Sequence, residues 1–499
     1  YPIPVPKEVP KPEGLDWRKL PKLMACMTKN SLENLRSKVL FNMNVLDAKG
    51  IRRRKMPLHQ CLILELIEAG FNESSAYLQD LIYDNIQLVN EDDIGIVVDL
   101  RKREDYLEHI CAGLQRAEKH KDRGNTKKEC VELLSLAMYY AEKGKGILWL
   151  AEKFFLAAIA VSSQYLIDGG RQKACCKYHY AKFLLDKFPG ADPEEPFNTL
   201  TEVRDNSIGK SWPLYEASED GEEVSLESVF AASAIQLHRV LLSKSKAVRK
   251  EDTGKSERLA RLAERRARDA DETTKTAEAI IEIGICQLMM NNLNNAQKTF
   301  ERAFKIYSGS NNVEGLCETR MHLAAVMQRL GDHETAARLL TEMGALAMQF
   351  SLRRQLGRAL HLLGELHLRR EKPELGTQHL SEAFACFMGF GFEKSMVSGM
   401  NKFEDLEVIY HTHSEVIYEE EAEQSRLMTS ISAGQELMAS YFSLLREAHG
   451  CAVAQMKTIE WKLSKIGWWL KKKQDDLLPC PCKTHNRTPL DVLSHKNIF

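Results

Sequence analysis

A regularly repeated order of residue sizes constrains the fold of this chain more than any other sequence feature. The first clear segment begins near Ala277 and orders its residues as small, small and large apolar, followed by a fourth aligned position three residues later. Two further segments repeat this order at the same spacing, so that the aligned residues are Gly284, Ala296, Phe300 and Ala303, then Ala324, Ala336, Leu340 and Met343, then Gly364, Gly376, Leu380 and Ala383. Three segments in one register predict tandem helical repeats that stack into an α-solenoid.

Each segment is predicted to fold as two helices, here called helix A and helix B. A small residue on helix A and another on helix B let the two backbones approach closely, and the large residue fills the space toward the next pair. This order resembles the tetratricopeptide repeat, although the period here is 40 residues rather than the usual ~34. An accidental Ala-rich helical bundle is the alternative, which three copies in one register disfavour.

Weaker copies of the repeat precede the clear ones. One contains Leu136 and Ala137 followed by Ala151, Phe155 and Ala158. A second contains Tyr180 and Ala181 and places Phe197 at the large position, provided that Pro193 takes the small position. The stretch 225–269 is a third candidate. We therefore predict about six helix pairs, three of them clear and three degenerate.

The composition favours a helical fold and excludes several classes of function. The 499 residues include only 28 Gly and 15 Pro, while 44% are hydrophobic and 28% are charged, which favours an all-α chain. The 69 basic and 70 acidic side chains balance, so no overall field attracts nucleic acid or an anionic membrane. The 12 scattered cysteines predict reduced thiols and a cytoplasmic location.

We therefore predict one all-α tetratricopeptide-repeat superhelix with helical caps at both ends. The predicted parts are an extended Pro-rich and basic N-terminal segment (1–56), a helical N-terminal region (57–112), degenerate helix pairs (113–275), three clear repeats (276–400), C-terminal helices (401–479) and a tail (480–499).

Three segments at the ends of the chain allow two interpretations each. Five prolines between Pro2 and Pro12 indicate a strap along another protein or a disordered tail. The basic run Arg52–Lys55 is interpreted as a solvated linker, with an acidic docking site as the alternative. A helix over 456–473 carries three tryptophans and is predicted to cap the solenoid, with docking to a partner as the alternative.

The helix A faces of a repeat solenoid usually line a concave groove. Counting from the start of each clear unit predicts the groove residues Glu278, Ile281, Ile285, Leu288 and Met289, then Glu318, Met321, Ala325, Gln328 and Arg329, then Arg358, His361, Glu365, Leu368 and Arg369. Chaperone-binding repeats carry a lysine where this chain has Ile281, Met321 and His361, so a co-chaperone is disfavoured. Apolar residues beside charges suit an amphipathic partner helix, and packing within the solenoid is the alternative for part of the set.

No sequence pattern predicts a catalytic, cofactor or metal site. Two GKS tripeptides, beginning at Gly209 and Gly254, lack the earlier glycine of a phosphate-binding loop. Only one residue lies between Cys480 and Cys482, whereas roughly two to four residues separate the paired cysteines of structural zinc sites. We expect no enzymatic activity and no cofactor.

Three segments carry a resemblance to a known family. They are CLILELIEAGF from Cys61, KREDYLEHICAGLQRAE from Lys102, and LGRALHLLGELHLRREKPELGTQHLSEAFACF from Leu356. In their order and spacing, residues 58–400 resemble the tetratricopeptide repeat protein 29 family of ciliary and flagellar axonemes. The resemblance implies a non-enzymatic scaffold that is associated with dynein arms and needed for axoneme assembly, beating and sperm motility.

The same resemblance implies that the partners of this chain are other axonemal proteins, such as dynein-arm or microtubule-associated components. It implies no nucleic acid and no membrane among them. Two other classes of function stay open at this point. A soluble cytosolic adaptor for signalling or spindle orientation would use the same groove. An enzyme with a fused repeat domain would need chemistry in residues 1–110 or 440–499, where no such motif occurs.

Overall fold

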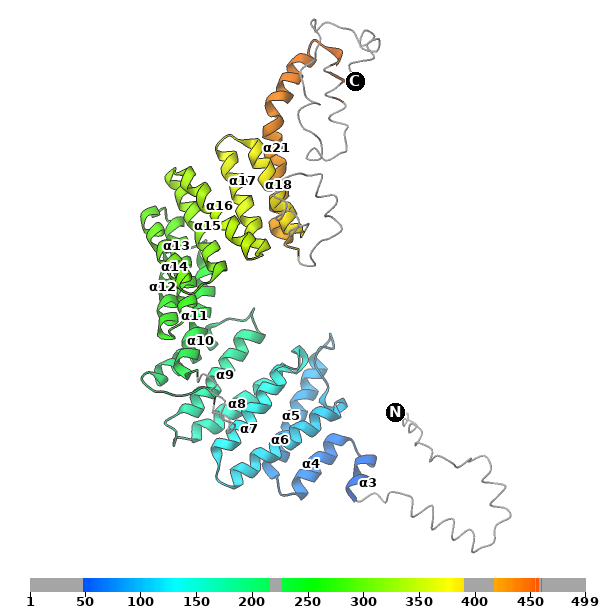
Figure 1. Ribbon diagram of the computed structural model, residues 1–499. Helices are drawn as coiled ribbons and strands as arrows, with labels where there is room; N and C mark the ends of the chain where they lie inside the picture. The colour runs from blue at the N-terminus through cyan, green and yellow to red at the C-terminus, as the bar shows by residue number, and fades with distance from the viewer. Residues whose placement is uncertain (1–47, 216–226, 390–416, 454, 457–458, 460–499) are drawn as a thin grey trace, which may run out of the picture. The chain divides into compact units, whose positions relative to one another are not determined.

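The computed structural model describes residues 48–215, 227–389, 417–453, 455, 456 and 459. Within these ranges the chain is helical and contains no β-strand (Figure 1). A single isolated bridge in the described residues pairs Pro213 with Ser228. The all-α prediction is therefore confirmed.

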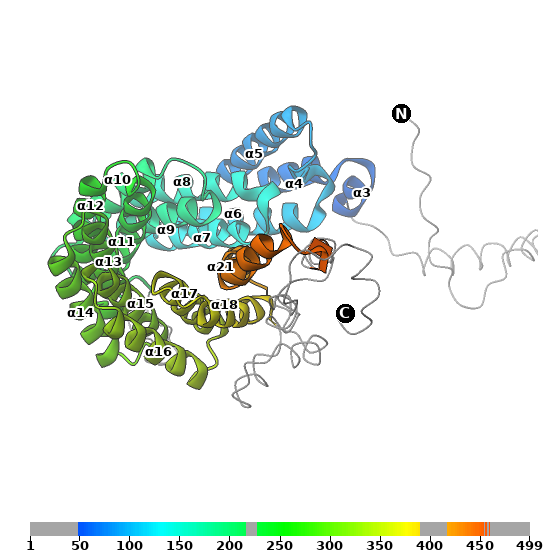
Figure 2. The ribbon, with the colours of Figure 1, turned by 90° about the horizontal axis from the view of Figure 1, so that it is seen from above.

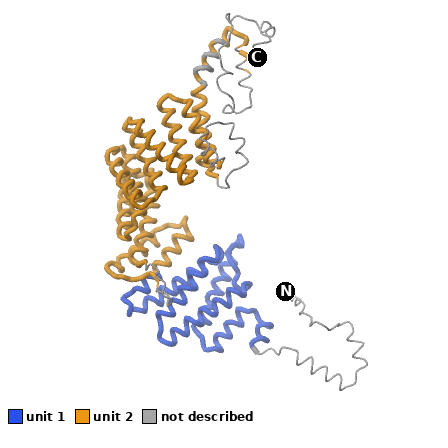
Figure 3. Tube along the Cα trace, in the orientation of Figure 1, with its two compact units in different colours: residues 1–176 blue, residues 177–499 orange. Residues whose placement is uncertain are grey.

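The chain divides into two compact units, residues 1–176 and 177–499 (Figure 3). The described helices of the first unit are α3 (Ala48–Lys55), α4 (Leu58–Glu68), α5 (Asn72–Glu91), α6 (Glu104–Asp122), α7 (Thr126–Ala141) and α8 (Leu148–Gln164), with short 3-10 turns η2 (Leu100–Lys102) and η3 (Lys145–Ile147). Helix α9 (Arg171–Lys187) contains the boundary between the units.

The second unit consists of helices that pack in chain order. After α9 they are α10 (Glu194–Ser207), α11 (Val229–Val248), α12 (Thr253–Asp269), α13 (Thr273–Met289), α14 (Leu293–Gly309), α15 (Val313–Leu330), α16 (His333–Gln349), α17 (Arg353–Arg369), α18 (Pro373–Met388) and α21 (Glu419–Ala448). Odd-numbered helices from α11 to α17 take the helix A position, and even-numbered helices from α12 to α18 take the helix B position.

The helices from α12 to α18 begin at equal intervals, and each interval is half of the period seen in the sequence. They begin at Thr253, Thr273, Leu293, Val313, His333, Arg353 and Pro373. A residue with left-handed backbone conformation ends each of the first six, at Asp271, Asn291, Asn311, Gly331, Ser351 and Glu371. The period exceeds the usual ~34 residues because helices such as α13 and α14 each have 17 residues.

Hydrogen bonds fix the geometry of these turns. The residue after each left-handed one donates its backbone N–H to the carbonyl five residues earlier, for example Asn312 to Tyr307 at 3.1 Å and Lys372 to His367 at 2.9 Å. This is the Schellman helix ending, which satisfies carbonyl groups that the helix leaves unpaired. Six equal turns therefore set the register of the array.

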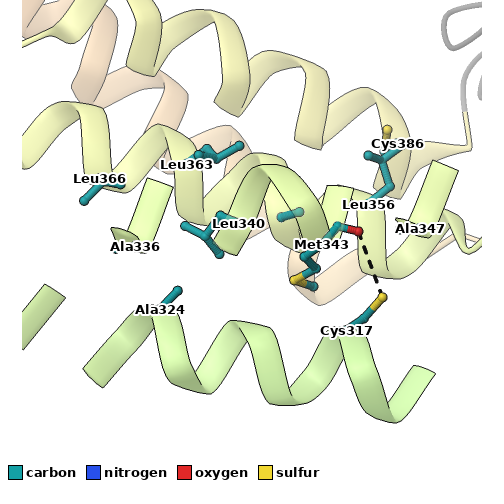
Figure 4. Close-up of a cluster of buried hydrophobic side chains, with 11 residues drawn as sticks. Cys317, Ala324, Ala336, Leu340, Met343, Ala347, Leu356, Leu363, Leu366 and Cys386 are labelled. Carbon is teal, nitrogen blue, oxygen red and sulfur yellow. Dashed lines mark hydrogen bonds between the residues drawn. The ribbon is translucent and has the colours of Figure 1, made fainter. Parts of the chain in front are cut away.

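Helix B packs through four buried positions, spaced by four, three and four residues. In α14 these positions are Ala296, Phe300, Ala303 and Tyr307. The same spacing selects Ala336, Leu340, Met343 and Ala347 in α16, and Gly376, Leu380, Ala383 and Phe387 in α18. Figure 4 shows Leu340 and Met343 in one apolar cluster with Cys317, Leu356 and Leu363 from the neighbouring helices. This stripe is one face of a helix with 3.6 residues per turn.

The degenerate copies upstream have the same stripe. It selects Ala151, Phe155, Ala158 and Ser162 in α8, and Ser256, Ala260, Ala263 and Ala267 in α12. In α10 the buried residues are Pro196, Leu200, Val203 and Ser207. The predicted alignment of Pro193 and Phe197 with the repeat is therefore wrong by three residues. Pro193 precedes the helix and Phe197 is half-buried.

Glycine residues on helix A make contacts in two directions. A β-carbon on Gly284 would lie 2.5 Å from Cε1 of Phe300, so the ring of helix B fills the space where a larger residue would stand. A β-carbon on Gly315 would likewise lie 2.5 Å from the ring of Tyr307, which belongs to the preceding helix B. The first contact was expected within a pair, and the second joins one pair to the next.

The basic run near the N-terminus is helical, contrary to the expectation of an extended segment up to residue 56. Arg52 and Arg53 lie in α3, and each guanidinium pairs with a carboxylate of α4. Arg52 bonds both oxygens of Glu68 at 2.5 and 2.7 Å, and Arg53 bonds both oxygens of Glu65 at 2.8 and 2.9 Å. These bidentate pairs hold α3 on α4.

One stretch, Lys145–Gln164, is long and apolar enough by composition to cross a membrane. In this structure it forms η3 and α8, whose residues Leu150, Ala151, Phe154 and Ala158 are fully buried within the first unit. Burial of this kind is that of a core helix in a helical array.

Helix α21 is the described part of the predicted C-terminal helices. It lies beside α18 and also contacts α17, as Figure 2 shows from above. Buried hydroxyl contacts join it to α18, with Thr377 Oγ1 2.9 Å from Ser432 Oγ. The proline-rich start, the three tryptophans and the Cys480–Cys482 tail lie outside the described residues. The nine described cysteines are buried.

Candidate functional site

The second unit contains a groove of about 820 Å³ on the helix A side, which we call the A-face groove. It is lined by Leu242, Lys246 and Arg249 of α11, by Glu278, Ile281, Glu282 and Ile285 of α13, by Glu314, Gly315, Glu318, Met321 and His322 of α15, by Arg358, His361, Leu362 and Glu365 of α17, by Glu421 and Gln424 of α21, and by Tyr307, Asn312 and Phe387.

The repeat itself aligns these side chains. Residues one repeat apart occupy the same position on successive A helices, so Ile281, Met321 and His361 form one row across the groove. Glu278, Glu318 and Arg358 form a second row, one helical turn toward the N-terminus of each helix. Along the array the first row therefore changes from apolar side chains to an imidazole, and the second changes from acidic to basic.

Eight of the predicted groove residues line the A-face groove. They are Glu278, Ile281, Ile285, Glu318, Met321, Arg358, His361 and Glu365. All eight lie before the last turn of their helices, which is the portion of each helix A that faces the groove.

The remaining predicted residues do not line it. Arg329 donates to the backbone carbonyl of Leu288 at 2.6 Å, and Arg369 donates to Oε1 of Gln328 at 3.1 Å, so both arginines link one helix A to the preceding one. Leu288 is 8% exposed and belongs to the core, whereas Met289 is 46% exposed at the helix end. Leu368 packs over Gly376, and Ala325 packs on the core of the α13–α15 region.

Two arginines in the groove are already in ion pairs. Arg249 Nη1 lies 3.1 Å from Glu282, whose side chain is almost fully buried. Arg358 Nη2 lies 3.1 Å from Glu421 and so joins α17 to α21. Burial raises the pKa of Glu282, while the cation of Arg249 opposes that shift. These pairs hold neighbouring helices together across the groove.

Glu318 differs from the other carboxylates of the groove. Its side chain is half-buried and, among the described residues, it neither accepts a hydrogen bond nor forms an ion pair. Burial raises its pKa; Lys246 and Arg358 attract the charge from neighbouring helices, and Glu278 and Glu282 repel it. Glu314, one turn earlier on α15, is exposed. The central helix therefore presents two carboxylates without a described partner.

Two histidines complete the groove: His322 stacks on an aromatic ring, and His361 contacts α21. His322 stacks on Phe300 with ring centres 5.2 Å apart, and burial lowers its pKa to about 4. His361 Nδ1 lies 2.8 Å from Ser425 Oγ of α21, and its Nε2 lies 3.4 Å from Glu365. His361 therefore connects helix α21 to the groove wall.

Sequence reasoning missed several lining residues. Glu282, Glu314 and His322 stand four residues from predicted positions and share their helix face, so the 3.6-residue helical repeat could have found them. The residues of α11 were missed because that pair was treated as degenerate. Glu421 and Gln424 were missed because no repeat signal marks α21 as a further helix A.

In the described residues, no group of three or more histidine, cysteine, aspartate or glutamate side chains is arranged to hold a metal ion. The groove places apolar side chains such as Ile281 and Met321 beside charged ones, a combination found at binding sites.

Among solved structures, this chain is similar to several helical proteins, one of which has TPR-like repeats. No protein-family model matches the chain, and the curated proteins contain no match. A kinesin light chain structure from Podospora anserina with nearly identical TPR-like repeats is 14% identical, covers 44% of this chain and 94% of its own, and has a TM-score of 0.29. Aspartyl phosphate phosphatase F from Bacillus subtilis is 11% identical over 84% and 91% of the two chains, with a TM-score of 0.35. The apo form of RapI is 10% identical over 70% and 92%, with a TM-score of 0.34.

Proposed function

We propose that this chain is a non-enzymatic scaffold that holds a partner protein in the A-face groove. The observation that carries the proposal is the groove itself, about 820 Å³ in volume and lined by successive A helices. Apolar residues such as Ile285 and Met321 lie beside charged ones, which is the combination that an amphipathic helix recognises. Apolar anchors supply affinity and the charges fix the register of the partner.

The setting that we propose is the axoneme of motile cilia or sperm flagella. The support is the ordered resemblance of residues 58–400 to an axonemal repeat family. In that setting the chain would associate with dynein-arm or other microtubule-associated proteins and contribute to axoneme assembly, beating and sperm motility. No nucleic acid or membrane is part of the proposal.

Fractionation of ciliated or sperm cells tests the axonemal setting. We expect the protein to stay with the axoneme through detergent and mild salt extraction. Proximity labelling should then identify dynein-arm or microtubule-associated neighbours. Release into the soluble fraction under mild extraction, or labelling without axonemal neighbours, would contradict this setting.

A groove variant tests the proposed contact surface. Met321→Arg places a charge among the apolar lining residues and should remove the partners found by proximity labelling. Glu334→Arg is the matched control, because Glu334 is exposed on helix B α16 and does not line the groove. Equal labelling by both variants would contradict a role for the groove, provided that both melt at the temperature of the parent protein.

The second candidate is a soluble cytosolic adaptor that binds partner helices in signalling or spindle orientation. The same groove favours it, since neither its shape nor its charges are specific to an axoneme. A soluble protein whose labelled neighbours depend on Met321 but lie in the cytosol would support this candidate over the axonemal one.

A further inference from the structure

We infer that the A-face groove selects a partner segment that carries an arginine or lysine, and that this cation binds Glu318 with Glu314 beside it. This inference rests on the proposed partner-binding function and adds the chemistry of the partner. The groove has a surplus of negative charge, because six of its lining residues are glutamates and three are lysine or arginine.

Most of these charges are already compensated within the protein. Glu282 is paired with Arg249, and Glu421 is paired with Arg358. Glu278 lies 2.9 Å from Lys275 on its own helix. Neither arginine of the groove is therefore free to neutralise a further carboxylate at close range.

Glu318 is left as the central carboxylate that Lys246 and Arg358 attract only from beyond ion-pair distance. It is half-buried on α15, between α13 and α17, so it has lost part of its hydration without gaining a hydrogen bond or ion pair among the described residues. A carboxylate in this condition gains more from an incoming cation than one in water does, because the effective dielectric is lower and charge-assisted hydrogen bonds are stronger.

The neighbours of Glu318 also fix what must flank the cation. Met321 and Ile281 lie in the next row of the groove, and Leu362 lines it from α17. A suitable partner helix would therefore carry apolar residues three or four positions from its basic one. Lys246, exposed on α11 and without a described ion pair, would favour an acidic residue at that end of the segment.

Selection from a peptide library tests the inference even though the partner is unidentified. Short random peptides displayed on phage would be selected on the full chain, on Glu318→Gln, on Glu318→Lys and on the control Glu334→Lys. On the full chain and the control we expect peptides with Arg or Lys beside apolar residues. On Glu318→Lys we expect Asp or Glu in place of the cation, because the charge of the site is reversed.

Affinities of the selected peptides provide the quantitative test. Glu318→Gln, which keeps the size of the side chain, should weaken the best basic peptide by about tenfold, whereas Glu334→Gln should leave it unchanged. Selected peptides that bind in the groove without any basic residue, or whose affinity ignores Glu318→Gln, would overturn the inference and leave the proposed function intact.

Two other outcomes are informative in different ways. Failure to select any peptide whose binding is lost in Met321→Arg would contradict the proposed function itself. A synthetic peptide with the Lys-rich sequence of residues 457–473 is a competitor in the same assay. If it binds the groove more tightly than every selected peptide, the occupant is the chain's own tail, and the inference of a separate partner is wrong.

Discussion

Gly364 of α17 and Gly376 of α18 bring the backbones of two helices into direct contact. A β-carbon on Gly364 would lie 3.1 Å from the carbonyl oxygen of Gly376, and one on Gly376 would lie 3.2 Å from the carbonyl oxygen of Gly364. The Gly364 position would also meet Leu380 at 2.5 Å. Because a backbone oxygen cannot rotate away as a side chain can, this pair leaves no space for even one methyl group.

Gly364→Ala should therefore destabilise the second unit by about 1–3 kcal/mol through overpacking. Thermal or urea unfolding followed by circular dichroism measures the loss. Gly434→Ala is the matched control, since Gly434 lies within α21 with no atom near its β-carbon position. The control should gain up to about 1 kcal/mol of helix propensity. Equal stability of Gly364→Ala and the parent would show that α17 and α18 are farther apart than described.

The left-handed turn residues predict two substitutions with opposite effects. Gly331 has φ 85° and Glu371 has φ 56°, at equivalent ends of α15 and α17. Gly331→Ala should cost about 1 kcal/mol, whereas Glu371→Gly should add up to about 1 kcal/mol by removing strain at a side chain that tolerates this conformation poorly. Both changes are measured by urea unfolding. A loss of stability in Glu371→Gly would contradict the left-handed conformation there.

The pair of Arg249 and Glu282 predicts a pH-dependent defect. Glu282 is 2% exposed, so Arg249→Met would leave a buried carboxylate without its cation and destabilise the protein by roughly 3 kcal/mol at neutral pH. The pKa of Glu282 is already raised by burial and would rise further. Since the folded state then binds its proton more readily than the unfolded state, the defect should diminish as the pH falls toward 4.5.

Addition of Glu282→Gln to Arg249→Met is the control for this mechanism. The double variant should recover part of the lost stability and lose the pH dependence of the defect, because no buried charge remains. The measurement is the urea midpoint of unfolding of both variants, at several pH values between neutral and mildly acid. A defect of the same size in both variants at every pH would mean that Arg249 acts through packing alone.

Two histidines, the buried His179 and the half-buried His322, predict that the parent protein loses stability in mild acid. Burial lowers the pKa of His179 and of His322 from 6.5 to about 4. Between these values the unfolded state takes up protons that the folded state does not, so stability falls as the pH decreases. Each group should contribute up to about 1.4 kcal/mol per pH unit. His322→Gln should reduce the slope of stability against pH, and an unchanged slope would contradict the burial of this ring.

The repeat could be predicted from the sequence because it depends on side-chain size. A small residue at Gly284 and a ring at Phe300 must meet in any close helix pair, and three copies of that order suffice to set the register. The equal spacing of single helices could not be predicted, because its turns depend on backbone conformation. Gly331 and Asn311 are typical of left-handed positions, whereas Ser351 and Glu371 adopt that conformation only because the helices on either side require it.

The groove was predictable only for the part of each helix A that faces it. Position in the repeat identified Ile281, Met321 and His361, but it could not distinguish lining residues from those that link adjacent A helices, such as Arg329. The incorrect alignment of Phe197 with the large position of the repeat has a similar cause. Its aromatic ring imitates the large position of the repeat, while the smaller Leu200 fills that position in the structure.

Equal spacing of all helices from α12 to α18 limits how such a chain can change in length. Deletion of one helix with its turn would keep every other turn intact but move a helix B sequence into a helix A position, exposing a stripe such as that of Phe300 and Tyr307. Deletion or duplication of a complete helix pair would preserve the alternation. Arrays of this kind can therefore grow or shrink only by whole pairs, and each such step adds or removes one wall of the groove.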